Sequence, residues 1–211
     1  MPNVNGPVLK GNAVIVFSKA PRPGHVKTRL IPEFGAHKAC YIHQQLLEYV
    51  IENISSIKDA DVYLHCSPDA SHNFFQYLKA QYHLVLDEQS EGDLGQRMYS
   101  AIKNGLEEYN KVVLIGSDCP LITKTYIKQA FDELNRSDVV FGPAEDGGYV
   151  LVAMKKPRSD IFTDIDWGSE RVLQQSIEKT QPDIPVLLDT LWDVDRAEDV
   201  ERFRHLNTHF I

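Results

Sequence analysis

Short runs of apolar, mostly β-branched residues recur along the chain and alternate with longer stretches that carry apolar residues at helical spacing. The first run, 13–17, is apolar throughout, which is typical of a strand covered on both faces. Alternation of this kind predicts β-α units whose strands pair in parallel. The predicted strands are 13–17, 62–66, 84–86, 112–115, 139–141, 149–154 and 185–188, and the predicted helices are 36–54, 94–109, 124–135, 170–179 and 197–207.

The strands predicted at 139–141 and 149–154 are separated by too few residues for a helical crossover. We therefore expect this pair to be antiparallel and to place one antiparallel strand at an edge of the sheet. No repeat, low-complexity run or Gly/Ser linker divides the chain, and 211 residues suit one domain. The prediction is a single α/β domain over 1–211, a Rossmann-type sandwich with a mainly parallel sheet, in which 1–12 form a loose N-terminal extension.

Composition excludes several classes of protein. Hydrophobic residues make up 43% of the chain and charged residues 25%, which excludes a disordered or fibrous protein. The net charge of −8 argues against a general nucleic-acid-binding protein. The three cysteines form no Cys-x-x-Cys pair, which argues against a disulfide framework and favours the reducing cytoplasm. No stretch reaches the roughly 18 apolar residues that a membrane span needs.

Charge is distributed unevenly, with a basic segment near the start of the chain and an acidic segment near its end. Residues 19–38 carry five Lys and Arg residues against one acid, whereas 183–201 carry seven acids against one Arg. Two solvated surfaces would produce this pattern, and so would two halves of one site that holds an anion and a cation. Charge alone leaves both interpretations open.

The basic segment directly follows the first predicted strand, at the end where open α/β sheets bind ligands. Its Lys and Arg side chains are donors suited to several phosphates, and two prolines stiffen the loop. The spacing fits neither a Walker A loop nor a dinucleotide-binding turn, and an ordinary basic surface loop is the alternative. The residues that we predict to bind an anion here are Ser18, Lys19, Gly24, Lys27 and Arg29.

Carboxylates follow two other predicted strands. Asp118 comes directly after the strand 112–115, where a hard divalent cation would be held. A helix N-cap is the alternative role for Asp118, although Thr123 fills that role better. Asp193 and Asp195 alternate, so on an extended segment both point the same way and repel each other unless a cation or basic group lies between them.

Two glycine-containing segments are further candidates. Gly147 and Gly148 fit a turn with positive φ that leaves room for a ligand, and Asp146 beside them is placed to bind an acceptor hydroxyl or act as a base. A plain hairpin turn is the simpler interpretation. In the segment 92–95, Asp93 is a predicted N-cap, and its glycines allow backbone to approach a base or ribose.

Together these motifs resemble the nucleotide-diphospho-sugar transferase superfamily, which has the GT-A fold. Within it the chain looks like the radical-SAM/selenodomain-associated transferase family, whose members are named as glycosyltransferases of arsenosugar-type pathways. The Lys-Thr-Arg-Leu segment is also similar to that of phospholactate guanylyltransferases. The matching segments are Phe17-Ser-Lys-Ala-Pro21, Pro23-Gly-His-Val-Lys-Thr-Arg-Leu30, Gly92-Asp-Leu-Gly95 with Arg97-Met98, Gly116-Ser-Asp-Cys-Pro120, Gly142-Pro-Ala-Glu-Asp-Gly-Gly-Tyr149 and Asp193-Val-Asp195.

The chain departs from this family at three points. Trp167-Gly-Ser169 stands where the family has Trp-Ser-Thr, and Arg196 stands where it has Thr. Only one acid, Asp118, follows the strand 112–115, so the Asp-x-Asp metal motif of sugar transferases is absent.

The resemblance implies an enzyme, a metal-dependent transferase that moves a sugar from a nucleotide sugar to a small-molecule acceptor. The alternatives are a nucleotidyltransferase that joins an NTP to a phospho- or carboxy-acceptor with release of pyrophosphate, and a non-catalytic nucleotide sensor. Mg²⁺ or Mn²⁺ would be held by Asp118 with Asp193 or Asp195. The resemblance also implies catalysis by Asp118, Lys27 and Asp146. It implies nucleotide binding by the basic loop together with Gly92, Asp93 and Gly95. The implied acceptor-binding residues are Asp146, Gly147, Gly148, Tyr149 and Trp167, although Trp167 is more simply a core residue.

Overall fold

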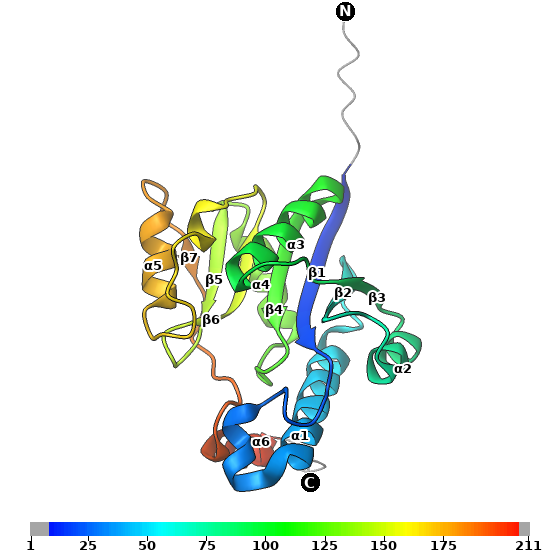
Figure 1. Cartoon of the computed structure of the whole chain (residues 1–211). Helices are drawn as coiled ribbons and strands as arrows, with labels where there is room; N and C mark the ends of the chain where they lie inside the picture. Colours follow the sequence, from blue (N-terminus) through cyan, green and yellow to red (C-terminus); the bar gives the residue numbers. More distant parts are fainter. Residues whose placement is uncertain (1–8, 207–211) are drawn as a thin grey trace, which may run out of the picture.

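In a computed structural model that describes residues 9–206, seven strands form one sheet in the order β3-β2-β1-β4-β6-β5-β7 (Figure 1). The strands are β1 (Lys10–Lys19), β2 (Ala60–Ser67), β3 (Val85–Glu88), β4 (Tyr109–Gly116), β5 (Val139–Pro143), β6 (Tyr149–Met154) and β7 (Val186–Leu187). The α-helices are α1 (Ile31–Ile54), α2 (Asn73–Tyr82), α3 (Leu94–Glu108), α4 (Lys124–Glu133), α5 (Val172–Lys179) and α6 (Ala197–Leu206), and short 3₁₀ helices lie at η1 (Thr28–Leu30) and η2 (Asp160–Phe162).

The predicted α/β fold with a mainly parallel sheet is confirmed, with one change in the position of the antiparallel strand. Within the described sheet, β6 runs antiparallel to β4 and to β5, whereas the other pairs are parallel. We expected this strand at an edge, but it lies inside the sheet. The reason is that β5 and the two-residue strand β7 add beyond β6, on the side away from β4.

Helices cover both faces of the sheet, as continuous apolar strands require. Alternate residues of β1 point to opposite faces: Val14 and Val16 belong to the core under α1, α2 and α4, whereas Ala13 and Ile15 pack with residues of α3 and α5. A third cluster joins α6 to α1 through buried side chains that include Val200. Figure 1 shows η1, the start of α1 and α6 gathered beyond the carboxyl end of β1.

Several predicted boundaries differ from the structure, and helix α2 is missing from the prediction. β1 begins at Lys10, so the last residues of the expected extension 1–12 belong to the sheet, and 1–8 lie outside the described residues. The sequence predicts no helix at α2, because Phe75 and Leu78 are its buried residues and make only a narrow apolar stripe. Gly35 has φ of 75° and interrupts α1, which explains why the apolar periodicity indicates a start at residue 36.

The sheet order reverses between β1 and β4, since β1 pairs with β2 on one side and with β4 on the other. Open α/β sheets bind ligands in the crevice at such a reversal, beyond the carboxyl ends of the strands. The basic loop after β1 and Asp118 after β4 meet at this point. Across residues 9–206, none of the helices combines the length and apolar character that crossing a membrane requires.

Candidate active site

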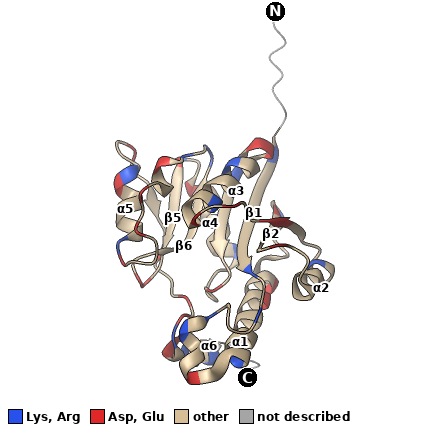
Figure 2. Ribbon diagram, in the orientation of Figure 1, with Lys and Arg blue, Asp and Glu red and all other residues tan. Residues whose placement is uncertain are grey.

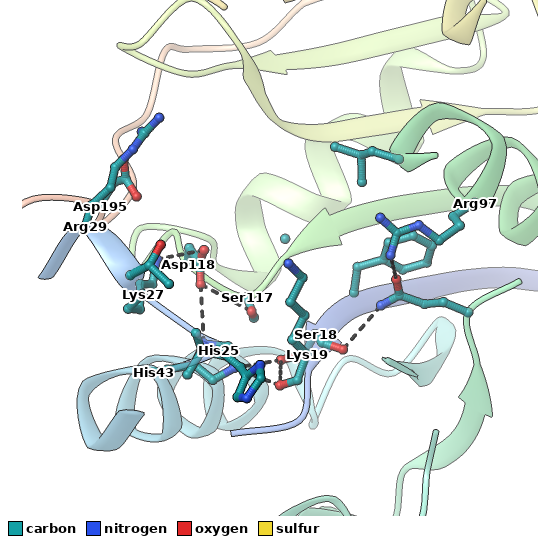
Figure 3. Close-up of a pocket in the computed structure, with 16 residues that line it drawn as sticks. Ser18, Lys19, His25, Lys27, Arg29, His43, Arg97, Ser117, Asp118 and Asp195 are labelled. Carbon is teal, nitrogen blue, oxygen red and sulfur yellow. Dashed lines mark hydrogen bonds and ion pairs between the residues drawn. The ribbon is translucent and has the colours of Figure 1, made fainter. Parts of the chain in front are cut away.

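A cavity of about 420 Å³ opens at the carboxyl ends of β1 and β4 (Figure 3). Its walls come from the loop before η1, from α1, from the segment that leads into α3, and from the loop after β4. The predicted residues that line it are Ser18, Lys19, Lys27, Arg29, Asp118 and Asp195. Gly24 belongs to the same loop but lies outside this lining.

Lys27 and Asp118 form an ion pair in this cavity. The Lys27 Nζ lies 2.7 Å from Asp118 Oδ2 and also donates to the carbonyl oxygen of Val194 at 2.5 Å. Only 5% of the Lys27 side chain is exposed, against 40% of the Asp118 side chain. Lys27 has φ of 47° and ψ of 45°, a left-handed conformation that is strained for a residue other than glycine. The buried contacts of its ammonium group hold Lys27 in this conformation.

Asp118 carries a negative charge because of its neighbours. Burial at the strand end opposes ionisation, but Lys27 and His43 outweigh it and hold the pKa of Asp118 below its usual value. Ser117 adds a hydrogen bond from its hydroxyl to Asp118 Oδ1 at 3.3 Å. The helix N-cap role considered for Asp118 belongs to Thr123, whose side chain accepts from the Tyr126 N–H.

Six polar residues that line this cavity are missing from the predicted site residues, namely His25, Thr28, His43, Gln89, Arg97 and Ser117. His43 comes from α1, and burial lowers its pKa. Gln89 donates through Nε2 to the carbonyl oxygens of His65 and Ser18 at 2.9 and 3.2 Å, and accepts from Arg97 at 3.1 Å. Arg97 thus brings a further cation to the α3 side of the cavity. A histidine within the apolar stripe of α1 is the signal that the sequence offered for His43.

Residues 92–95 form the start of α3, and of these four residues Leu94 lines the cavity. The carboxylate of Asp93 accepts from Gln96 N at 2.8 Å in a capping box, as the predicted N-cap requires. A Cβ at Gly95 would lie 2.5 Å from the carbonyl oxygen of Phe162, so glycine is needed there for close packing. Gly92 and Gly95 are not among the lining residues of the cavity.

A second cavity of about 240 Å³ adjoins the first and shares Arg29 and Asp195 with it. These two side chains form an ion pair. Burial and the nearby charge of Asp146 raise the pKa of Asp193 to about 6. The remaining lining residues are Glu145, Trp192, Arg196 and Asp199, so five acids and two arginines face this space. Figure 2 shows basic and acidic residues close together around α6 and the adjoining loop.

The other residues predicted to bind an acceptor lie outside both cavities. Tyr149 packs against Phe141 and Trp167, with ring centroids 5.1 and 6.4 Å apart, which places the two predicted aromatic residues in a hydrophobic cluster. Gly147 has φ of 87°, and a Cβ there would lie 2.1 Å from the carbonyl oxygen of Glu170. Gly148 donates its N–H to Asp146 Oδ1 at 2.9 Å, so both glycines form a tight turn.

The predicted metal ligands are brought together in part. Within residues 9–206, no three or more His, Cys, Asp and Glu side chains are grouped so as to hold a metal ion. Asp118 and Asp193 lie close enough for the charge of one to affect the ionisation of the other. Mg²⁺ is often held by one or two carboxylates together with substrate phosphates, and these two carboxylates fit that kind of site.

Solved structures with the same fold include two from bacteria. A protein of Desulfovibrio desulfuricans G20, provisionally named a nucleotide-diphospho-sugar transferase, is similar with a TM-score of 0.85 and 29% identity over 95% of this chain and 89% of that chain. The 4-diphosphocytidyl-2C-methyl-D-erythritol synthase of Anaerococcus prevotii is similar with a TM-score of 0.64, 12% identity and coverage of 95% and 97%. The second likeness shows the fold alone.

Similarity in sequence extends to proteins of archaea. The 2-phospho-L-lactate guanylyltransferase of Methanothermobacter thermautotrophicus is 29% identical over 140 residues, which are 66% of this chain and 60% of that protein. The chain therefore spans about 60% of the length of the curated relatives that it matches. Residues 50–169 match a family described as an uncharacterized protein conserved in bacteria (DUF2064). Since this match covers more than half of the chain, the protein belongs to the DUF2064 family.

Proposed function

We propose that the chain is a transferase that acts on the phosphates of a nucleotide, and that it joins the nucleotidyl group of an NTP to a small acceptor with release of pyrophosphate. The observation that carries this proposal is the first cavity, which Lys19, Lys27, Arg29 and Arg97 line together with Asp118. Four cationic side chains suit a triphosphate better than the two phosphates of a nucleotide sugar. Similarity to two guanylyltransferases supports the same reaction class.

In this reaction an oxygen of the acceptor forms a bond to the α-phosphorus of the NTP. The bond from that phosphorus to the oxygen bridging to the β-phosphate breaks, and its electron pair leaves with pyrophosphate. Negative charge builds up on the leaving group, so the ammonium of Lys27 and the other cations stabilise the transition state. Lys27 needs little reorganisation for this role, because Asp118 and the Val194 carbonyl already hold it.

The proposal includes Mg²⁺ or Mn²⁺. Asp118 and Asp193 would hold the cation together with phosphate oxygens, whereas Asp195 is engaged by Arg29. When bound, the cation neutralises phosphate charge that the protein's own cations do not reach.

We place the acceptor in the second cavity, which Arg29 and Asp195 connect to the first. An acceptor that reacts through a hydroxyl must lose a proton, and Asp146 is the exposed carboxylate that we assign as its base. Gly147 and Gly148 form the tight turn beside Asp146, with the Gly148 N–H donating to Asp146 Oδ1.

Glycosyl transfer from a nucleotide sugar is the second candidate. It is favoured by the similarity to the Desulfovibrio protein over nearly the whole chain, and by a second cavity whose acids suit sugar hydroxyls. The single acid after β4, Asp118, is the feature that makes it second. An arsenosugar-type acceptor would be a special case of this candidate.

The two candidates release different products. We would incubate the protein with the common NTPs and, separately, with nucleotide sugars, in the presence of Mg²⁺ or Mn²⁺ and a panel of phosphorylated, carboxylated and hydroxylated acceptors. Release of pyrophosphate from an NTP, abolished by chelator, is the expected result. Nucleoside diphosphate release from a nucleotide sugar without any pyrophosphate would favour glycosyl transfer. Nucleotide binding by calorimetry without either product would indicate a sensor.

A further inference from the structure

Helix α1 carries a buried histidine on the face that it turns toward the sheet. His43 is 4% exposed, and its buried neighbours along this face, Ile42, Leu46 and Leu47, are apolar. A buried polar ring lowers stability unless it is hydrogen-bonded, and an apolar side chain would fill the same space without that requirement. Packing alone therefore does not account for a histidine at this position.

The ring of His43 lies between the ends of two strands. Its Nε2 is 2.9 Å from the carbonyl oxygen of Lys19, the last residue of β1, and 3.4 Å from the hydroxyl of Ser18. Because a carbonyl oxygen only accepts, Nε2 carries the hydrogen. The other nitrogen, Nδ1, lies 3.9 Å from Asp118 Oδ1 beyond the end of β4 (Figure 3).

These contacts bear on the two groups that face the phosphates in the proposed reaction. His43 holds the backbone of Lys19, whose own side chain is exposed and forms none of the ion pairs found among residues 9–206. On its other side, His43 borders Asp118, whose second carboxylate oxygen binds Lys27 at 2.7 Å. One planar ring thus lies between the backbone of Lys19 and the carboxylate of Asp118.

We propose that His43 is a positioning residue, and this inference rests on the proposed nucleotide-dependent function. Through its hydrogen bond to the Lys19 carbonyl and its position beside Asp118, His43 fixes the backbone from which the Lys19 side chain extends relative to the Asp118 carboxylate. The two groups then reach the same nucleotide phosphates without reorganisation. Small misplacements of groups that contact the reacting phosphates lower the rate strongly. His43 itself exchanges no proton in this role.

Two substitutions separate positioning from packing. His43→Leu keeps a buried side chain of good helical propensity but leaves the Lys19 carbonyl oxygen without this hydrogen bond, so the melting temperature falls modestly. We expect kcat/KM for the nucleotide to fall roughly 10- to 100-fold, as for loss of a group that orients a ligand-binding residue. His43→Gln places an amide nitrogen near the position of Nε2, and we expect it to recover most of that loss.

Thr180→Val is the matched control. Thr180 is 1% exposed, hydrogen-bonds to the carbonyl oxygen of Ile177 at 2.7 Å, and lines neither cavity. Its substitution removes the hydrogen bonds of this hydroxyl to the carbonyl oxygens of Ile177 and Asp183, so the melting temperature falls while kcat/KM stays unchanged.

Amide hydrogen exchange of the ligand-free protein gives a readout that does not depend on turnover. His43→Leu should speed exchange at residues 18–20, and His43→Gln should restore it. If the parent protein is active and His43→Leu is equally active, or if the amide exchange rates of residues 18–20 do not change, the positioning role is overturned and the proposed function is unaffected. A parent protein that neither binds nor converts nucleotides overturns both.

Discussion

The two cavities share Arg29 and Asp195 but hold their charges in different ways. In the first, the side chains of Lys27 and His43 are almost fully buried and are bound to backbone carbonyl oxygens, Lys27 to that of Val194 and His43 to that of Lys19. In the second, the exposed Glu145 pairs with Arg202, and Asp195 pairs with the exposed Arg29. Groups fixed by buried backbone contacts cannot adjust to a substitution, whereas exposed ion pairs can. The first cavity should therefore be far less tolerant of change.

Substitution of Asp118 in the first cavity should have the largest effect. Asp118→Asn keeps an oxygen that can accept from Lys27 but removes the negative charge that holds Lys27 and that we assign to metal binding. We expect kcat to fall on the order of 10²- to 10³-fold, the usual effect of losing one strong electrostatic group. Steady-state rates measured well below the melting temperature test this.

Asp132→Asn is the control for this substitution, because Asp132 is an exposed acid of α4 that pairs with Lys128 away from both cavities. It should leave the rate unchanged. An Asp118→Asn protein with the parent rate, or a parent that is fully active in excess chelator, would contradict the assigned role.

Asp193 is the exception in the second cavity, since it is the acid there whose ionisation is opposed by burial. Its pKa of about 6 lies above the usual 3.8, so between these values the folded chain holds a proton that the unfolded chain has lost. This group therefore lowers stability as pH rises from about 4 to 6, and the loss persists above that range. The shift corresponds to roughly 3 kcal/mol at most, because solvent reaches part of the side chain.

Asp193→Asn should accordingly be more stable than the parent at pH 7.5 and equal to it near pH 4. Urea unfolding of both proteins at several pH values measures the difference in their free energies of unfolding. Burial lowers the pKa of His43, which affects stability in the opposite direction, but this effect is the same in both proteins and cancels in the difference. A parent that is as stable as Asp193→Asn at pH 7.5 would show that Asp193 ionises without penalty.

The sequence predicted the first cavity better than the second for a physical reason. Lys19, Lys27 and Asp118 follow buried strands, and the carboxyl ends of parallel strands meet at one edge, so order along the chain predicts proximity. His43 escaped prediction because helical spacing alone gives the face of α1 on which it lies and not the strand ends that it touches.

Residues around the second cavity follow from tertiary packing that no local pattern encodes. Tyr149 and Trp167 are candidate acceptor residues, with Trp167 more simply a core residue, and their rings pack against each other in a hydrophobic cluster. The position of β6 also differs from the prediction, because the predicted strand 185–188, which contains β7, carries no sign of the strand with which it pairs.

Lys19 tests the first cavity at its exposed edge. Lys19→Ala removes a donor to phosphate without leaving a buried charge unpaired, so the effect should be confined to binding. A hydrogen bond to a charged group contributes about 1.5–3 kcal/mol, which corresponds to a KM for the nucleotide raised roughly 10- to 100-fold with little change in kcat. Lys58→Ala is the matched control, because Lys58 is an exposed lysine outside both cavities. An equal effect of both substitutions would mean that only net charge matters.

The ion pair between Arg29 and Asp195, which borders both cavities, should show the smallest effect on stability. Arg29 is 63% exposed and Asp195 34%, and such pairs usually contribute about 0–1 kcal/mol. A double-mutant cycle with Arg29→Met and Asp195→Asn should therefore give a coupling free energy of unfolding below about 1 kcal/mol.

The kinetics of the same two variants are more informative, because Arg29 released from Asp195 is free to bind phosphate. If Arg29 belongs to the donor site, Asp195→Asn lowers the KM for the nucleotide and Arg29→Met raises it, while the KM for the acceptor stays the same. The reverse pattern, with only the KM for the acceptor changed, would assign the pair to the second cavity. Three cationic side chains would then remain in the first cavity to bind the triphosphate of an NTP.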